Sequence, residues 1–423
     1  MQDLGKHTSA IRVAFFNVTD VGSGAESLIR LTVEGLIARG IDARLYVTFP
    51  ITTDRYVFRI PLVRYERQIE PRLRVLTGWN DLFFPSTWRL GRHAWLKNAD
   101  LWHFHNLHGH YVSLPVLARE SRRRPIILSP VDQFLSTGYC PYTLGCLRYQ
   151  DSCGSCPQLD LPYPGISRDA TATLLRMKKS AVTKSGFDVL VHTDFLARHY
   201  RSTFVNTRPI TRLHYGIDTN VFRPMDRKQC AEILGLKYSS RFVVGIFHSN
   251  ILEERKGFLP LLERLRQLAD RMPGVLEVLV VGKKSEHAQD FKTLNLPVTT
   301  LPYIRDQVEL ARAINLCDVL LYPTQAENLS LTCLDAMSCG VPVISSDVGG
   351  QGEAIDDGVN GYLCAAEDSA RFIDRIAALA KDSTLQRRLS AQARRIVLER
   401  FDINSYVDNL IVYYNQVLQK RTT

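Results

Sequence analysis

The chain has 423 residues, of which 45% are hydrophobic, and it contains no apolar run long enough to cross a bilayer as a helix. We therefore expect a soluble, well-cored protein of two or three domains rather than a membrane-spanning one. The formal net charge of +10 comes entirely from the first half, because residues 1–210 contain 27 Lys and Arg against 17 Asp and Glu, whereas residues 211–423 contain 26 of each.

The N-terminal sequence MQDLGKHTSAIRVAFF lacks the basic start and the small-residue cleavage site of a secretory signal. Five of the nine cysteines are scattered through expected core elements, which agrees with a reducing compartment. They are Cys230, Cys317, Cys333, Cys339 and Cys364. We expect a cytoplasmic protein.

In the first half, short apolar strands alternate with longer amphipathic helices. Strands are predicted at IRVAFFNV (11–18), DARLYV (42–47), DLWHFH (100–105), PIILSP (125–130) and FDVLVHT (187–193), with a helix at 25–40 between the first two. Strands that alternate with helices predict a parallel, doubly wound α/β sheet.

The second half repeats this pattern with strands at 241–247, 276–282, 298–304, 318–323 and 341–346. We therefore predict two Rossmann-like domains, an N-terminal one over 1–205 and a C-terminal one over 206–400. Residues 401–423 form an amphipathic helix that would pack on either domain, and we favour the first. Ligands of such sheets lie beyond the carboxyl ends of the strands, so two facing domains would close a cleft around the substrates.

A basic and aromatic stretch occupies residues 55–97. It mixes eight arginines with aromatic residues that include Tyr56, Trp79, Phe83, Phe84, Trp88 and Trp95. This composition suits an anionic membrane surface or a lipid-linked substrate, because rings lie at headgroup level and cations are attracted to the surface. A plain solvated surface is the equal alternative, and single-stranded nucleic acid a weaker one.

Two clusters in the first domain carry metal-ligand side chains. The histidines His103, His105, His108 and His110 surround Asn106 at a strand end, but the first two share one strand face and the others follow in a loop, which argues against a ligand set. The loop at 138–158 places Cys140, Cys146, Cys153 and Cys156 in the spacing C-x5-C-x6-C-x2-C. In a reducing compartment this spacing favours a structural zinc site over free thiols or a redox pair, and no catalytic metal is implied.

Two strand ends of the second domain offer sites for an anion. Arg255, Lys256 and Gly257 follow the strand at 241–247, and adjacent cations at a strand end can neutralise a diphosphate, although an exposed basic turn would look the same. The motif ENLSLTCLD then places Glu327 and Asp335 on either side of an expected helix start, whose backbone N–H groups form a second anion site. That helix start lies at Ser330, Leu331 and Thr332.

The segment PTQAENLSLTCLDAMSCGVPVISSDVGGQGEAI (323–355) with GVNGYL resembles the signature of retaining glycosyltransferases of family 4, which have the GT-B fold and use nucleotide-sugar donors. The resemblance implies that Glu327 lies by the donor sugar and Asp335, an Asp in place of the family's Glu, holds the ribose. Lys256 then contacts the diphosphate, with Arg255 in place of a missing family arginine. Gly282 and Ile304 would lie along the nucleotide.

The first half resembles the same family. VGSGAESLIRLTVEGLIARG (21–40) is similar to its glycine loop, which implies that Gly24 approaches the donor phosphates and the acceptor. HFHNLHGH and the cysteine-rich segment resemble bacterial exopolysaccharide enzymes of the colanic-acid type, which implies that Asn106 and His108 line the acceptor side. That subgroup has a His-Asp pair where this chain has Val131 and Asp132, so either Asp132 or His108 would act as base for the acceptor hydroxyl.

Our hypothesis is a metal-independent, retaining transfer of a hexose from a UDP or GDP donor to a hydroxyl of a lipid-linked saccharide. The reaction would serve surface polysaccharide synthesis at the inner face of the plasma membrane. The replacement of the family's His by Val131 keeps open a non-catalytic or altered-specificity nucleotide-sugar-binding protein of the same fold. A nicotinamide oxidoreductase is disfavoured because no G-x-G-x-x-G follows the first strand, and we expect no nucleic-acid partner.

Overall fold

The computed structural model describes residues 11–22, 24–79, 81–82, 84–159, 168–250, 254–283 and 296–421. Contacts divide the chain into two units. The first unit combines residues 1–192, 196–213 and 406–423, and the second combines residues 193–195 and 214–405. The division after residue 213 lies eight positions beyond the boundary expected from the sequence, and the last helix belongs mostly to the first unit.

The first unit is built on a seven-stranded sheet in the order β3-β2-β1-β4-β5-β6-β7, in which every pairing is parallel. Its strands are β1 (Arg12–Thr19), β2 (Asp42–Phe49), β3 (Val57–Arg59), β4 (Leu101–His105), β5 (Ile126–Ser129), β6 (Asp188–Val191) and β7 (Ile210–Arg212). Its helices are α1 (Gly24–Ala38), α2 (Glu66–Thr77), α3 (Ser86–Leu90), α4 (Ala94–Lys97), α5 (Leu114–Glu120), α6 (Thr171–Thr183), α7 (Asp194–Arg201) and α15 (Ile403–Gln419), the last two of which begin in the second unit.

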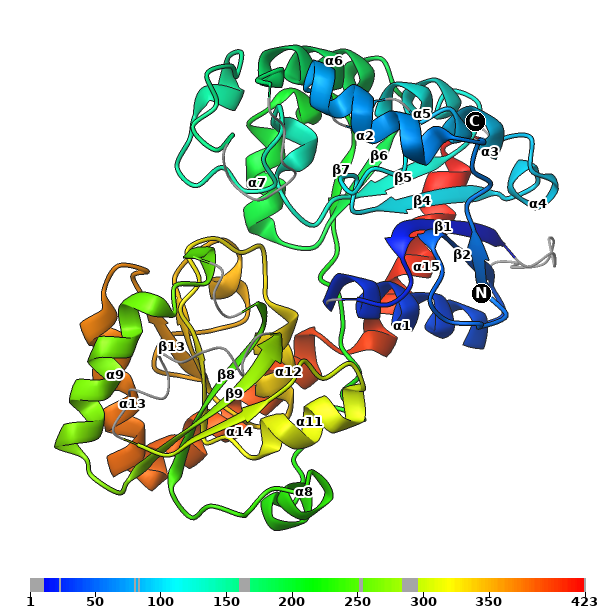
Figure 1. Ribbon diagram of the computed structural model, residues 1–423. Helices are drawn as coiled ribbons and strands as arrows, with labels where there is room; N and C mark the ends of the chain where they lie inside the picture. Colours follow the sequence, from blue (N-terminus) through cyan, green and yellow to red (C-terminus); the bar gives the residue numbers. More distant parts are fainter. Residues whose placement is uncertain are drawn as a thin grey trace. The chain divides into compact units, whose positions relative to one another are not determined.

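The apolar runs of the first unit become central strands because helices cover both faces of its sheet. Val13 to Phe16 of β1 are completely buried. Helices α5 and α6 lie on one face, and α1 and α15 lie on the other (Figure 1). Tyr414 of α15 reaches the sheet through a 2.7 Å hydrogen bond between its hydroxyl and Nδ1 of His103. Helix α15 is therefore part of the core of this unit.

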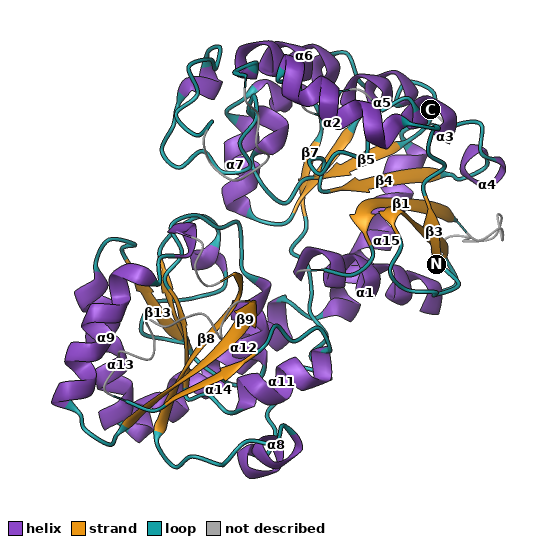
Figure 2. Cartoon of the chain, viewed as in Figure 1, coloured by secondary structure: helices purple, strands orange, loops and turns teal. Residues whose placement is uncertain are grey.

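The second unit contains a six-stranded parallel sheet in the order β10-β9-β8-β11-β12-β13. Its strands are β8 (Phe242–Asn250), β9 (Leu276–Lys283), β10 (Val298–Leu301), β11 (Val319–Tyr322), β12 (Val343–Ser346) and β13 (Gly361–Cys364). Its helices are α8 (Arg227–Ile233), α9 (Leu259–Arg271), α11 (Gln307–Asn315), α12 (Leu331–Ser338), α13 (Ser369–Lys381) and α14 (Ser383–Arg400), with a 3-10 turn η4 (Glu254–Lys256) after β8. Helices α9 and α13 cover one face, and α11 and α12 the other (Figure 2).

Both sheets place their first and fourth strands side by side, so the chain winds outward in two directions from the pairs β1–β4 and β8–β11. This is the Rossmann strand order, in which the crevice for a ligand forms at the carboxyl ends of those two central strands. The sequence-predicted strands are confirmed as β1, β2, β4, β5, β6 and β8 to β12. The short edge strands β3, β7 and β13 were not predicted.

Candidate functional site

The predicted donor residues of the second unit gather where β8 and β11 end. Lys256, in η4 after β8, is 5% exposed, and its ammonium Nζ lies 3.3 Å from Oε2 of Glu327 in the loop after β11. Two residues that are 71 positions apart in the chain therefore form a buried ion pair at the crevice of this sheet.

Tyr322, the last residue of β11, completes this pair. Its hydroxyl donates a 2.9 Å hydrogen bond to Oε2 of Glu327, and the backbone N–H of Asn328 donates to Oε1 at 3.1 Å. Burial by itself would raise the pKa of Glu327, but the charges of Lys256 and Arg255 and these hydrogen bonds outweigh it and lower the pKa to about 2. Glu327 is thus a carboxylate at any physiological pH.

Two glycines allow the backbone around Glu327 to pack closely. Gly257 has a φ of +67°, and a Cβ there would lie 1.9 Å from the carbonyl oxygen of Pro323. Gly349 has a φ of +63°, and a Cβ there would lie 1.7 Å from the carbonyl oxygen of Glu327 itself. Only glycine fits both the conformation and the space, so these residues set the position of the Glu327 loop.

Helix α12 begins beside this loop. Its N-cap is Ser330, whose Oγ accepts a hydrogen bond from the N–H of Cys333, and the N–H of Ser330 donates to Oε1 of the buried Gln351 at 2.8 Å. The first backbone N–H groups of the helix, at Leu331 and Thr332, have no acceptor within the helix and form the positive end of its dipole. The predicted helix start is confirmed, and it lies on the Glu327 side of the crevice.

Asp335 lies one turn into α12, and its carboxyl group is buried. Burial raises the pKa of Asp335 well above its ordinary value. Burial therefore disfavours the charged carboxylate relative to an exposed aspartate, and the neutral acid can donate a hydrogen bond as well as accept one. A contact with ribose hydroxyls, as predicted from the sequence, is compatible with either form.

The remaining donor-side residues lie at strand ends of the same sheet. Arg255 precedes Lys256, and its guanidinium donates to the carbonyl of Ala326 at 2.7 Å, so it braces the loop that carries Glu327. Gly282 is the penultimate residue of β9, and Ile304 follows β10. All of these residues therefore share one edge of the sheet.

In the first unit, the predicted acceptor-side residues follow the central strands β1 and β4. Gly24 is the exposed first residue of α1. Asn106, directly after β4, has a φ of +44°, and its buried Oδ1 has no hydrogen-bond partner. The left-handed backbone of Asn106 and its unpaired buried oxygen are two unusual features of one residue. Together they mark the loop after β4 as a candidate binding segment.

His108 and Asp132 form a hydrogen-bonded pair in this loop region. Nε2 of His108 lies 2.5 Å from Oδ2 of Asp132, and Oδ1 of Asp132 accepts from the N–H of Phe134 at 2.9 Å. Burial lowers the pKa of His108, but the Asp132 charge outweighs burial and the pKa is raised. The histidine side chain is 21% exposed and the aspartate 6%, so the imidazole is the accessible end of the pair.

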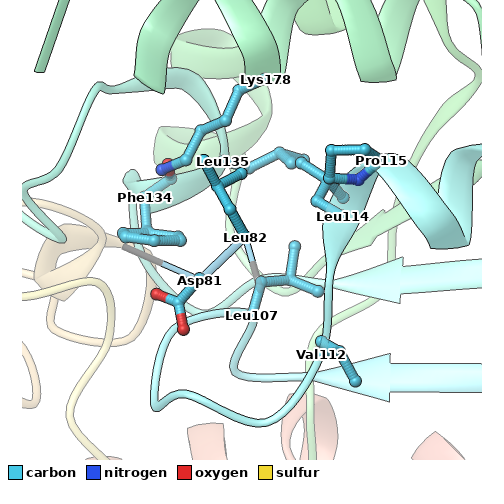
Figure 3. A pocket seen from close by; sticks show the side chains of 9 residues that line it. All are labelled: Asp81, Leu82, Leu107, Val112, Leu114, Pro115, Phe134, Leu135 and Lys178. Atoms are coloured by element: carbon cyan, nitrogen blue, oxygen red, sulfur yellow. The ribbon is translucent and has the colours of Figure 1, made fainter. Parts of the chain in front are cut away.

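A cavity of about 20 Å³, enough for one water molecule, is lined by Leu107 and Phe134, which are near His108 and Asp132 in the sequence (Figure 3). Its wall is mostly apolar and consists of Leu82, Leu107, Val112, Leu114, Pro115, Phe134 and Leu135, with Asp81 and Lys178 as the charged members. Burial lowers the pKa of Lys178 to about 7, and its ammonium donates to the carbonyl of Phe134 at 2.7 Å. Oδ2 of Asp81 is buried without a partner, so the cavity has an unused acceptor in its wall.

The two strand histidines of the cluster, His103 and His105, are core residues. His103 bonds to Ser129 and Tyr414, and burial lowers its pKa well below the ordinary value. Burial likewise lowers the pKa of His105 to about 3. The sequence argument against a histidine metal site agrees with this placement.

The four cysteines of the loop at 138–158 are half-buried thiols, and burial raises the pKa of Cys140 to about 12 and also raises those of Cys153 and Cys156. They supply the sulfur ligands that zinc prefers, but no three of these sulfurs all lie within 4.8 Å of one another. Zinc binding would therefore require the loop to tighten from the conformation described.

Within the described part of the chain, the only potential ligand group of that size is Asp194, His214 and Glu353. Both oxygens of Glu353 already accept backbone N–H groups, from Asp194 at 2.7 Å and Phe195 at 2.8 Å. Glu353 therefore caps the start of α7, which is a structural role.

Sequence reasoning missed two members of the donor site. From the sequence, Tyr322 was interpreted only as part of an apolar strand, and Gln351 only as part of the signature segment 323–355. The position of Tyr322 at the last residue of β11, before the Glu327 loop, was the available signal.

Comparisons with known proteins agree with this architecture. Sucrose-phosphate synthase from Thermosynechococcus elongatus superimposes with a TM-score of 0.70 at 18% identity, covering 97% of this chain and 100% of that one. Anabaena HepE in complex with UDP-glucose superimposes with a TM-score of 0.67 at 17% identity, covering 96% and 99%. Together with the two parallel Rossmann-order sheets, these neighbours define a GT-B fold, as predicted.

Residues 243–382, which contain the donor-side residues described above, match the family described as Glycosyl transferases group 1. This match agrees with the predicted enzyme class, glycosyltransferase.

Curated relatives carry related names. The chain is 22% identical over 418 residues to D-inositol 3-phosphate glycosyltransferase of Mycobacterium avium (strain 104), covering 96% of this chain and 85% of that protein. It is 27% identical over 215 residues to N-acetyl-alpha-D-glucosaminyl L-malate synthase of Bacillus anthracis, covering 50% and 55%. In most such matches the chain spans about half the length of the relative. Separately, none of the described helices is long and apolar enough to cross a membrane.

Proposed function

We propose that this glycosyltransferase moves a hexose from a UDP- or GDP-sugar to a hydroxyl of a lipid-linked saccharide, with retention of configuration at the anomeric carbon. The observation that carries the proposal is the pairing of Lys256 with Glu327 beside the start of α12, within the group 1 domain. The relative bound to UDP-glucose supports a nucleotide-sugar donor.

The donor would dock with its diphosphate between Lys256 and the first N–H groups of α12. The ammonium of Lys256 donates a hydrogen bond to the carboxylate of Glu327. A bound diphosphate would therefore share this ammonium with Glu327. As the bond between the anomeric carbon and the phosphate oxygen breaks, negative charge grows on the diphosphate, and Lys256 and the helix dipole stabilise it. Glu327, ionised because of its low pKa, stabilises the positive charge that develops on the sugar.

The acceptor hydroxyl would attack from the side of the departing diphosphate, forming the new bond to the anomeric carbon while its proton passes to the leaving phosphate oxygen or to a base. Of the two candidate bases, we favour His108, because it is the accessible member of its pair with Asp132. Asp132 would orient the imidazole and raise its basicity. Arg255, Gly282, Ile304 and Asp335 would line the nucleotide, and Gly24 and Asn106 the acceptor side.

We further propose that the chain acts in surface polysaccharide synthesis of the exopolysaccharide type, and that zinc on the four loop cysteines braces the loop at 138–158 without taking part in chemistry. A non-catalytic nucleotide-sugar-binding role is the second candidate. It is favoured by Val131 in place of the family histidine and by the raised pKa of Asp335.

The decisive experiment is to incubate purified protein with UDP-, GDP- and ADP-sugars and to follow both thermal stabilisation and slow donor hydrolysis. We expect one nucleotide class to stabilise the protein and to be hydrolysed, and the released sugar to keep the anomeric configuration of the donor. Glu327→Ala and Lys256→Ala should each reduce turnover by at least about 100-fold. Stabilisation without any turnover would favour the binding-protein alternative, and inversion at the anomeric carbon would rule out a retaining reaction.

A further inference from the structure

Helix α2 buries charged residues and exposes apolar ones. Its buried residues are two glutamates, Glu66 at 2% exposure and Glu70 at 5%, whereas Ile69, Val75 and Leu76 on the same helix are 42%, 51% and 68% exposed. A surface helix of a soluble protein normally shows the opposite arrangement. The burial of the glutamates and the exposure of the large apolar residues each need a physical explanation.

The buried side is explained by specific contacts. Oε2 of Glu66 accepts the backbone N–H of Ser86 at 2.6 Å, and Oε1 accepts its hydroxyl at 2.7 Å, which caps α3. Glu70 lies 3.4 Å from the guanidinium of Arg74 and 3.6 Å from Nδ1 of His110. These contacts fix the orientation of α2 about its own axis. As a result, its apolar residues face outward.

The exposed side of α2 gathers large apolar residues. Ile69 and Leu76 are seven positions apart with Arg72 between them, so the three share one strip of the helix. Tyr65 before the helix is 53% exposed and Trp79 after it 49%. Five of the 17 large hydrophobic residues that are exposed in the described chain thus fall within residues 65–79, a concentration that scattered surface residues would not produce.

Cations border this surface. The guanidinium of Arg64 lies 4.7 Å from the ring centre of Tyr65. That of Arg67 lies 4.1 Å from the ring centre of Phe49, which is the last residue of β2 and is 49% exposed. The only acidic residues within 62–79 are the two glutamates that α2 buries. The outer face of α2 is therefore apolar and purely cationic.

We propose that the outer face of α2, together with Tyr65, Trp79 and Phe49, docks onto an anionic lipid bilayer. Exposed aliphatic and aromatic side chains can enter the headgroup region while arginines at the border pair with lipid phosphates. Charge decides between this occupant and a second copy of the chain, because two identical cationic faces would repel each other. The excess of positive charge on the first half of the chain acts in the same direction.

This surface also connects to the loop after β4. The Glu70 carboxylate contacts His110, and the backbone N–H of His110 donates to Asp81 of the cavity at 2.8 Å. Docking through α2 would therefore place the loop that carries His108 close to the bilayer, where a lipid-linked acceptor is found. This last step rests on the proposed function, whereas the docking itself does not.

The test is flotation of the full-length protein with vesicles of phosphatidylcholine alone or mixed with phosphatidylglycerol, without any sugar donor. We expect binding only to the anionic vesicles, weakened at high salt. The double substitution Ile69→Ser with Leu76→Ser should weaken binding by at least about 10-fold, because it removes two exposed apolar anchors and no buried contact. Val412→Ser on α15, equally exposed at 55%, is the matched control and should bind like wild type.

Arg64→Gln with Arg72→Gln should reduce binding to anionic vesicles and leave the unfolding temperature unchanged. Failure of wild-type protein to bind anionic vesicles at low salt, or equal binding by wild type and the Ile69 and Leu76 double variant, would overturn the proposal. A wild-type dimer in sedimentation that the double variant dissociates would show that a second copy covers this face instead. Because no donor is present, these outcomes are independent of whether sugar transfer is confirmed.

Discussion

Substituting one partner of the Lys256–Glu327 pair should show how strongly the stability of the second unit depends on that pair. The pKa of Glu327 falls from an ordinary 4.5 to about 2, and at about 1.4 kcal/mol per pH unit this corresponds to about 3 kcal/mol of net stabilisation of the ionised carboxylate. Lys256 supplies the largest favourable part. Lys256→Met removes the ammonium but keeps most of the buried side-chain volume, so the carboxylate is left without its main counter-charge.

We expect Lys256→Met to destabilise the second unit by about 2–3 kcal/mol at neutral pH, and the double variant with Glu327→Gln to recover much of that loss. The assay is urea unfolding of wild type, both single variants and the double variant, which yields a coupling energy for the pair. The folded-state pKa of Glu327 lies below its unfolded value. The stabilisation is therefore complete above about pH 4.5 and is lost as the pH falls toward about 2.

The coupling energy should accordingly be large at pH 7 and decrease in acid. A coupling below about 0.5 kcal/mol at pH 7 would refute the reasoning, since it would mean that water, not Lys256, balances the carboxylate. A coupling that grows as the pH is lowered would refute the assigned direction of the Glu327 pKa shift.

Three further predictions follow from the contacts described. Gly349→Ala should lower the free energy of unfolding by at least about 2 kcal/mol and abolish stabilisation by the donor. Gly274→Ala, also at positive φ but with open space around its Cβ, should lower it by only about 1 kcal/mol. Equal effects of the two substitutions would contradict the close-packing argument. Asp132→Asn should lower the unfolding temperature most below about pH 6.5, because the raised pKa of His108 stabilises the fold at low pH and this stabilisation is lost as the pH rises through that pKa. A difference in unfolding temperature between wild type and variant that grows with pH would contradict this. Elemental analysis should find about one zinc per chain, and no zinc with all four loop thiols readily alkylated would dismiss the zinc site.

Several features of the protein follow from local sequence. The strands β1 and β8 are short apolar runs between turn residues, and Ser330 precedes a helix whose first N–H groups it caps, so both were predictable from neighbouring residues. The motif from Glu327 to Asp335 indicated a donor site because a carboxylate, a helix start and a second carboxylate occur at fixed spacing.

Local sequence predicted neither helix α2 nor which of its faces is buried. The arginines and rings of residues 55–97 suggested one mixed surface, but Trp95 packs under the guanidinium of Arg44 and Phe84 is 5% exposed, while Ile69 and Leu76 face outward. The pattern of α2 predicts no buried glutamates, because their partners Ser86 and His110 come from other elements.

Sequence by itself determined the central strands of both sheets, the start of α12 and which loop carries the donor carboxylate. These features depend on hydrophobic periodicity and on side chains within a few residues of each other. Tertiary structure decided that Lys256 meets Glu327, that His108 meets Asp132, and which side of α2 is exposed. Each of these depends on parallel strands that bring distant loops to one edge of a sheet, where burial strengthens electrostatic interactions and sets the pKa values. No local pattern contains that information.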